Sequence, residues 1–199
     1  TKDLKLSYFL LIFAIISFCF GFYIDEDSAG SGGFILDFNK TWNFVINLKN
    51  EMKFLQDEYS SHTPLHYLVL SQLLSITGSQ NFTRITYFLI CFFIPFLFYK
   101  CLKLQFQQLS KINLILIVSM VFFLPSFRSS AIWANSSTTA IIFFLIFLYN
   151  FISWSKKNKV YKSSLNKEIF FQTFFLALAV YTRQYLSLIH ISEPTRPSS

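Results

Sequence analysis

The sequence predicts an all-α fold: a polytopic transmembrane helical bundle with an extracytoplasmic loop at the membrane interface. Hydrophobic residues fill 53% of the 199 positions, phenylalanine alone fills 27, and charged residues make up only 14%, against about 25% in ordinary soluble domains. The apolar residues form blocks separated by lysine-rich or turn-rich stretches, the pattern of a multi-span membrane protein. This composition excludes a water-exposed globular enzyme, a disordered chain, a disulfide scaffold and a coiled coil.

The first apolar block, residues 7–24, is an uncharged run of 18 residues, about the length that crosses the hydrocarbon core. A signal peptide is the alternative, but its apolar region would be shorter and followed by a small-residue cleavage site. Residues 25–61 then mix apolar side chains with Lys and Asn. That mixture predicts short amphipathic helices lying at the membrane interface.

Five more apolar blocks follow, at residues 64–77, 85–99, 112–127, 131–154 and 169–185. None of them alternates between apolar and polar residues as a half-buried strand does, so each is predicted to be a helix. Pro95 and Pro125 are expected to kink or end the helices that contain them.

Lysine placement predicts the orientation of these helices. Lys2 and Lys5 put the N-terminus on the cytoplasmic side, and the connectors at 100–111 and 156–167 should lie there too. Both conditions are met when the short block at 64–77 crosses the membrane only partly. Because no basic stripe lies on a soluble element, we expect the positive charge to face anionic lipid headgroups and not nucleic acid.

Both ends of the chain suggest a fragment. The first residue is Thr, and an apolar block begins almost at once. Residues 186–196 resemble the translation of a transposase-adapter sequence used in sequencing libraries, although a natural polar tail is the alternative. We therefore expect residues 1–185 to be an N-terminal transmembrane module and residues 186–199 a non-native tail, in which His190 has no role.

Three adjacent carboxylates, Asp25, Glu26 and Asp27, directly follow the first block. Their mutual repulsion at a low-dielectric boundary should raise the pKa of at least one of them. A carboxylate of that kind suits a general base that deprotonates an acceptor hydroxyl. A solvated acidic cap on a transmembrane helix fits the same spacing.

Two histidines, His62 and His66, are four residues apart and share one helix face. They could bind a metal, or position a phosphate or a substrate hydroxyl, and structural interfacial histidines are the third possibility. Cys19, Cys91 and Cys101 lack metal-ligand spacing and read as small hydrophobic residues. The sequence thus identifies no cofactor. Apart from the two histidines, nothing in it suggests a divalent metal.

Three arginines, Arg84, Arg128 and Arg183, lie at the ends of apolar blocks or inside them. An arginine at membrane depth is costly and usually faces a cavity or a partner, and its planar fork suits phosphate. Interface anchoring also explains Arg84 and Arg128. Arg183 lies within an apolar run, where anchoring explains it less well.

The order of these motifs resembles the N-terminal module of the GT-C class of polytopic glycosyltransferases. The Asp25-Glu26 pair resembles the family's Asp-Glu pair at the end of the first span. Residues 62–67 (HTPLHY) are similar to the His-Pro-Pro-Leu-type motif of the protein-mannosyltransferase and aminoarabinose-transferase branches. Residues 181–184 (YTRQ) resemble part of the glucosyltransferase that caps the dolichol-linked oligosaccharide.

The resemblance implies transfer of a sugar from a polyprenyl-phosphate donor to a glycan, lipid or protein acceptor at the extracytoplasmic face. It implies Asp25 as the general base, with Glu26 in support. The residues it implies for substrate contact are His62 and His66 at the entrance, and Arg84, Arg128 or Arg183 at the departing phosphate. Relatives often carry an acidic residue in the stretch that corresponds to 129–135, and this sequence has none there.

Two alternatives stay open: a transporter or flippase of lipid-linked glycans, which also needs cations in a membrane cavity, and a glycan polymerase. A transporter should show inverted repeats and helices broken at mid-membrane, and neither is visible in the sequence. The transferase hypothesis predicts that Asp25 and His62 converge across the outer loop.

Overall fold

The computed structural model describes residues 2–50, 64–158 and 166–183. No strand occurs in these residues, which confirms the predicted all-α class. In chain order the helices are α1 (Lys2–Tyr23), α2 (Gly33–Asn50), α3 (Leu65–Thr77), α4 (Gln80–Cys91), α5 (Phe93–Gln105), α6 (Lys111–Val121), α7 (Pro125–Ile132), α8 (Ser136–Asn158) and α9 (Asn166–Thr182).

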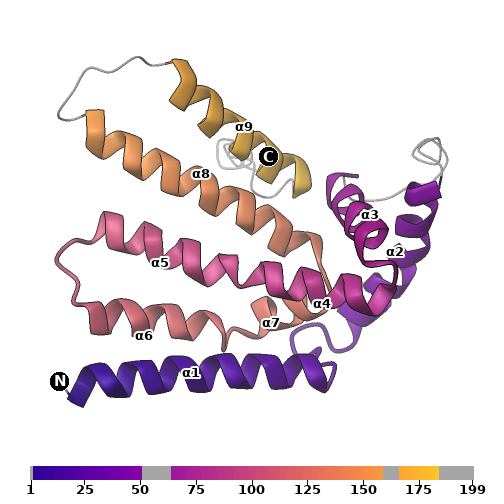
Figure 1. Cartoon of the computed structure of the whole chain (residues 1–199), viewed down its shortest axis with the longest axis horizontal. Coiled ribbons are helices and arrows are strands. Elements are labelled where there is room, and N and C mark those ends of the chain that lie inside the picture. Colours follow the sequence, from indigo (N-terminus) through magenta and orange to yellow (C-terminus); the bar gives the residue numbers. More distant parts are fainter. Residues whose placement is uncertain (1, 51–63, 159–165, 184–199) are drawn as a thin grey trace, which may run out of the picture.

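Five of the helices lie side by side in the order α1, α6, α5, α8, α9 (Figure 1). The remaining helices, α2, α3, α4 and α7, gather toward the end of this row at which α1 finishes. At the opposite end α5 gives way to α6 and α8 finishes. The arrangement therefore has a lysine-bearing end, where α6 begins, and a second end where the candidate site residues meet.

Three helical stretches among the described residues are long and apolar enough to cross a membrane: Asp3–Tyr23, Gln80–Gln105 and Ser136–Lys156. The second contains both α4 and α5. The pair α6 and α7 makes a fourth if it counts as one span, although it is bent by 59°. α3 is a shorter apolar helix of 13 residues, so the partial crossing expected at 64–77 stays a prediction.

The predicted boundary between the blocks at 112–127 and 131–154 was wrong. α6 stops at Val121, and Pro125 begins a separate helix that continues through Ile132. Proline suits the first position of a helix because its missing N–H has no intrahelical partner there. The next break falls at Ala134, whose φ of 47° is left-handed, and α8 then begins at Ser136.

Pro95 accompanies a smaller break. It lies three residues after Phe92, where α4 gives way to α5. Pro95 has no N–H to donate to the carbonyl of Cys91. At the break itself, the Phe92 N–H bonds at 3.2 Å to the carbonyl of Leu89, three residues back instead of the four of an α-helix. The predicted kink is thus confirmed as a helix break, although the two helices remain one apolar stretch.

The segment after α1 contains an amphipathic helix, as predicted for the first part of 25–61. α2 buries Phe38, Trp42 and Val45, which recur at intervals of four and three residues, and packs against α3. The Asp27 carboxylate accepts from the N–H groups of Phe34 and Ile35 at 2.9 and 3.2 Å, which satisfies free donors of the first turn.

Phe18 lies in the core and packs α1 against three other helical segments. Its side chain is fully buried. Its ring centroid is 4.5 Å from Phe88, 5.5 Å from Phe122 and 5.2 Å from Phe127, which belong to α4, the end of α6 and α7. Such aromatic pairs add about 0.5–1.5 kcal/mol each beyond the area they bury, so they fix the last turns of α1 against the elements that carry the candidate arginines.

Candidate active site

The three carboxylates after α1 point to three different partners. Asp25, in a left-handed conformation with φ of 56°, forms an ion pair with Arg84. Glu26 forms an ion pair with Arg128, and Asp27 binds the start of α2 as described above. The tight turn therefore separates the carboxylates, and cationic or N–H partners replace the mutual repulsion expected from their adjacency.

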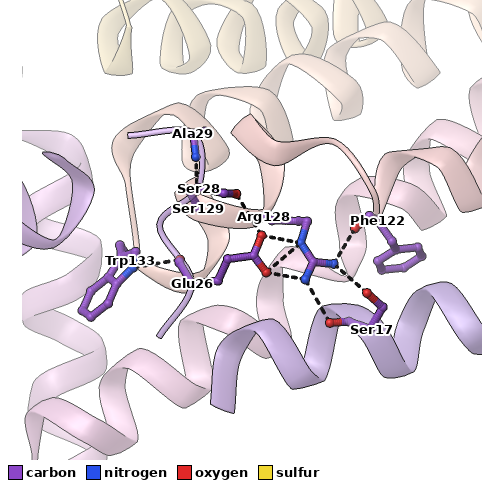
Figure 2. A network of polar contacts seen from close by, with 8 residues as sticks. All are labelled: Ser17, Glu26, Ser28, Ala29, Phe122, Arg128, Ser129 and Trp133. Carbon is purple, nitrogen blue, oxygen red and sulfur yellow. Dashed lines mark hydrogen bonds and ion pairs between the residues drawn. The ribbon is translucent and has the colours of Figure 1, made fainter. Parts of the chain in front are cut away.

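The Glu26–Arg128 pair joins the end of α1 to α7, as Figure 2 shows. Nε of Arg128 donates to both carboxylate oxygens, at 2.9 and 3.0 Å, and its second terminal nitrogen also binds Glu26. The hydroxyl of Ser28 donates to the same carboxylate at 2.9 Å. These charge-assisted bonds lower the pKa of Glu26 below its usual value, because they favour the ionised form more than partial burial disfavours it.

The hydrogen-bond donors of Arg128 are all used within the protein. Besides Glu26, it donates to the Ser17 carbonyl at 3.0 Å, the Ser17 hydroxyl at 3.3 Å and the Phe122 carbonyl at 3.1 Å (Figure 2). All three guanidinium nitrogens are thus bonded, and the residue is only 8% exposed. Arg128 therefore has no donor directed at a ligand, although the sequence suggested it as a phosphate-binding residue.

A glycine makes room for this pair. A Cβ placed on Gly21 would lie less than 3.0 Å from both the Glu26 carboxylate and the Arg128 guanidinium, a separation that real Cβ atoms essentially never show. Gly21 lies in the last turns of α1, where glycine is otherwise unfavourable. Its position is explained by the close approach of the ion pair, which no local pattern in the sequence indicates.

The second ion pair is more open. The Asp25 side chain is 57% exposed, whereas Arg84, in α4, is 14% exposed. The Arg84 guanidinium lies between two aromatic faces, 4.6 Å from the Phe22 ring and 4.3 Å from the Trp133 ring. Its Nε is buried and has no hydrogen-bond partner in the part of the chain that the structure describes.

A pocket of about 310 Å³ adjoins this open pair. Its walls come from the end of α1 and the first turns of α4, and they include Asp25, Arg84 and the amide side chain of Asn81. The pocket thus combines an exposed carboxylate, a guanidinium held by aromatic rings and a neutral hydrogen-bonding group. A carboxylate in such a pocket can accept a proton, and a guanidinium can bind an anion.

The turn of residues 133–135, which links α7 to α8, contacts most of the candidate residues. Trp133 donates from Nε1 to the Glu26 carbonyl at 3.1 Å, besides covering Arg84. The Asn135 side-chain oxygen accepts from a terminal nitrogen of Arg183 at 2.8 Å. The 133–135 turn thus joins segments that are far apart in the sequence.

His66 also binds the 133–135 turn. Its Nε2 lies 2.7 Å from the Ala134 carbonyl, and its Nδ1 lies 2.9 Å from the Thr139 hydroxyl. Because a carbonyl only accepts, Nε2 carries a proton and donates to Ala134, while Nδ1 is hydrogen-bonded to the Thr139 hydroxyl. His66 is 3% exposed, so its ring lies in the core and not at an entrance. His62 lies outside the described residues, and its predicted convergence with Asp25 stays a prediction.

The structure gathers Asp25, Glu26, Arg84 and Arg128 around the end of α1, and it connects His66 and Arg183 to them through the 133–135 turn. In the sequence this turn stands out as a stretch without a carboxylate, just before a helix led by Asn, Ser and Thr. Its signal was present in the run Trp-Ala-Asn followed by Ser and Thr, because Asn135 and the next residues are typical of a helix start. The partners of the turn come from distant segments and could not be read locally.

Among the described residues, no group of three or more His, Cys, Asp or Glu side chains could hold a metal ion. The possible metal at His62 and His66 is not tested by this, since one of the two lies outside those residues. The chain matches no family model, no curated protein and no solved structure. A function for this chain is therefore inferred from the geometry of the Asp25–Arg84 pocket.

Proposed function

We propose that this chain is a transmembrane module of a membrane glycosyltransferase that moves a sugar from a polyprenyl-phosphate donor to a glycan, lipid or protein acceptor. The apolar helices support a location in the bilayer. The lysine distribution supports a multi-pass orientation in which the end of α1 faces the extracytoplasmic side. The observation that carries the proposal is the contrast between the two ion pairs at that end.

The Glu26–Arg128 ion pair has a structural role, whereas the Asp25–Arg84 ion pair can open to bind substrate. Glu26 and Arg128 are mutually satisfied and largely buried, whereas Asp25 is mostly exposed beside a pocket. We assign Asp25 as the general base and Glu26 as a positioning residue that fixes the backbone next to it. The support that Glu26 gives is therefore mechanical and does not involve a second proton acceptor.

Arg84 is the phosphate-binding residue in this proposal. Its aromatic neighbours hold the guanidinium plane in place, and its ion pair with Asp25 is the contact that an incoming phosphate would displace. The exchange leaves Asp25 free to take the proton of the acceptor hydroxyl. The acceptor oxygen then bonds to the anomeric carbon as the bond from that carbon to the phosphate oxygen breaks, and Arg84 neutralises the departing lipid phosphate.

The remaining candidates take supporting roles. His66 and Arg128 hold the backbone that carries the site, as their buried hydrogen bonds indicate. Arg183, bound to Asn135 through one nitrogen, lies close enough to the 133–135 turn to contribute positive charge on that side. His62 keeps its predicted place at the entrance.

The test separates donor binding from turnover. The fragment alone is expected to be inactive, so the complete protein that contains it is reconstituted in proteoliposomes and assayed with a panel of polyprenyl-phosphate hexoses and acceptors. Asp25→Asn keeps the side-chain shape but removes the proton acceptor, so turnover should fall by about 10²–10⁴-fold while donor binding is nearly unchanged. Arg84→Met should mainly weaken donor binding, because it removes a charge-assisted contact.

Asp37→Asn is the matched control, since Asp37 is an exposed carboxylate of α2 and should leave both quantities unchanged. Wild-type turnover in the Asp25→Asn variant would show that the base is misassigned. If Asp25, Glu26 and Asp27 all prove dispensable, the transferase proposal fails, and a transporter or flippase of lipid-linked glycans becomes the better explanation of the pocket at Arg84. Extension of a bound glycan by repeated units would favour a polymerase.

A further inference from the structure

A groove of about 370 Å³ lies between α1, α5 and α6, away from the pocket at Asp25. Its volume falls in the roughly 300–1,000 Å³ range of ligand pockets. Its walls are almost entirely aliphatic or aromatic, and Leu11, Ile15 and Ile115 are representative of them. The polar groups in its lining come from Tyr8, Tyr99 and Lys111.

These polar groups lie at one end of the groove. Tyr8 belongs to the early turns of α1, Tyr99 to the later turns of α5, and Lys111 is the first residue of α6, and Figure 1 places these three segments at the same end of the helix row. The Lys111 ammonium lies 5.5 Å from the Tyr8 ring centroid. The groove is therefore amphipathic along its length, with an apolar body and a cationic, phenolic mouth.

A second lysine, Lys100, lies beside the groove without lining it. The Lys100 ammonium lies 5.4 Å from the ring of Phe96, which itself lines the groove. Lys103, also exposed, lies one turn further along α5 but does not line the groove. Lys111 thus lines the groove, Lys100 lies against one of the lining rings, and no carboxylate is among the lining residues.

We propose that this groove binds an anionic phospholipid, with one acyl chain along the apolar body and the phosphate headgroup at Lys111 and Lys100. Basic pockets between membrane helices on the cytoplasmic side recognise acidic headgroups, and tyrosines favour the headgroup level of a bilayer. Any lipid could fill the apolar body, so the lysines account for headgroup selectivity. The inference depends on membrane insertion but not on glycosyl transfer.

The first experiment measures that selectivity on the full chain. Native mass spectrometry of detergent-purified protein compares retention of phosphatidylglycerol and phosphatidylcholine with identical acyl chains. We expect the wild type to retain phosphatidylglycerol preferentially. Each lysine near a membrane surface contributes about a fivefold preference for anionic lipid, so Lys100→Gln with Lys111→Gln should reduce the preference by more than tenfold.

Lys103→Gln with Lys156→Gln is the matched control, because it removes the same charge from lysines for which neither a place in the lining nor a contact with a lining ring is seen. Equal loss of preference in both double variants would overturn the proposal, since it would make the effect one of overall charge. Equal retention of the two lipids by the wild type would also overturn it, and this measurement needs no variant to fold.

The second experiment tests the apolar body. Leu11→Trp inserts a bulky ring into the groove and should lower phosphatidylglycerol retention, whereas Ile12→Trp, on the exposed side of α1, should not. Glycerol 3-phosphate supplies the headgroup charge without an acyl chain and should not compete. Competition by glycerol 3-phosphate, or equal effects of the two tryptophan variants, would show that the groove does not hold the lipid chain.

Discussion

The indole Nε1 of Trp133 donates a hydrogen bond of 3.1 Å to the backbone carbonyl of Glu26, across 107 positions of the sequence. The ring of the same tryptophan lies 4.3 Å from the Arg84 guanidinium. Trp133 therefore touches both ion pairs of the candidate site, the backbone of one and the cation of the other. Substitutions around it test how the site is assembled, separately from the chemistry proposed for Asp25.

Trp133→Phe should weaken the site without unfolding the protein. The variant keeps an aromatic face for Arg84 but loses the hydrogen bond to Glu26, which costs about 1 kcal/mol of unfolding free energy. Trp133→Ala removes both contacts and should cost about 3–5 kcal/mol, as large core truncations do. Denaturant titration in mixed micelles measures both values. Equal losses for the two variants would contradict the separate roles of ring and indole N–H.

Glu26→Gln should be strongly destabilising, because it leaves the Arg128 guanidinium largely buried without its anion. Breaking one side of such a pair costs about 3–5 kcal/mol. Adding Arg128→Met to Glu26→Gln removes the unpaired charge, so the double variant should lose less unfolding free energy than the sum of the single variants. A double-mutant cycle from denaturant titrations gives the coupling, and a coupling near zero would contradict the proposed framework.

The stability of the wild type should fall in acid because of the same pair. The pKa of Glu26 is lowered in the folded protein from its usual value of 4.5, so the unfolded chain takes up its proton first. The stabilisation is complete above that usual value and is lost as the pH falls through the lower, folded-state pKa. Between neutral pH and about pH 3, the unfolding free energy of the wild type should therefore fall more steeply than that of Glu26→Gln.

Gly21→Ala should disturb the ion pair through space alone. The added methyl group would occupy the position where the Glu26 carboxylate and the Arg128 guanidinium meet, and overpacking of this kind costs about 1–3 kcal/mol. Gly33→Ala is the matched control, since nothing lies within 4 Å of a Cβ there. Melting temperatures of the two variants and the wild type check the prediction, and an unchanged Gly21→Ala variant would contradict the tight fit.

Much of the fold was predictable from local pattern. The uncharged run at 7–24 and the absence of alternation in the later blocks predicted helices, because periodicity and length are properties of short windows. Pro95 and Pro125 marked breaks for the same reason, since a missing N–H acts on the helix that contains it. The exact break at Ala134 was missed because Asn135 and the residues after it indicate a helix start but do not specify a left-handed residue before it.

The sequence by itself determined that the apolar blocks are helical. It also placed four charged residues at the ends of those blocks: Asp25, Glu26, Arg84 and Arg128. Only the tertiary structure decided which carboxylate pairs with which arginine. Glu26 and Arg128 are 102 positions apart, and their contact depends on packing around Phe18, on the space at Gly21 and on the 133–135 turn. Partner choice is a property of three-dimensional packing, so adjacent residues such as Asp25 and Glu26 can end up with different exposure and different proposed roles.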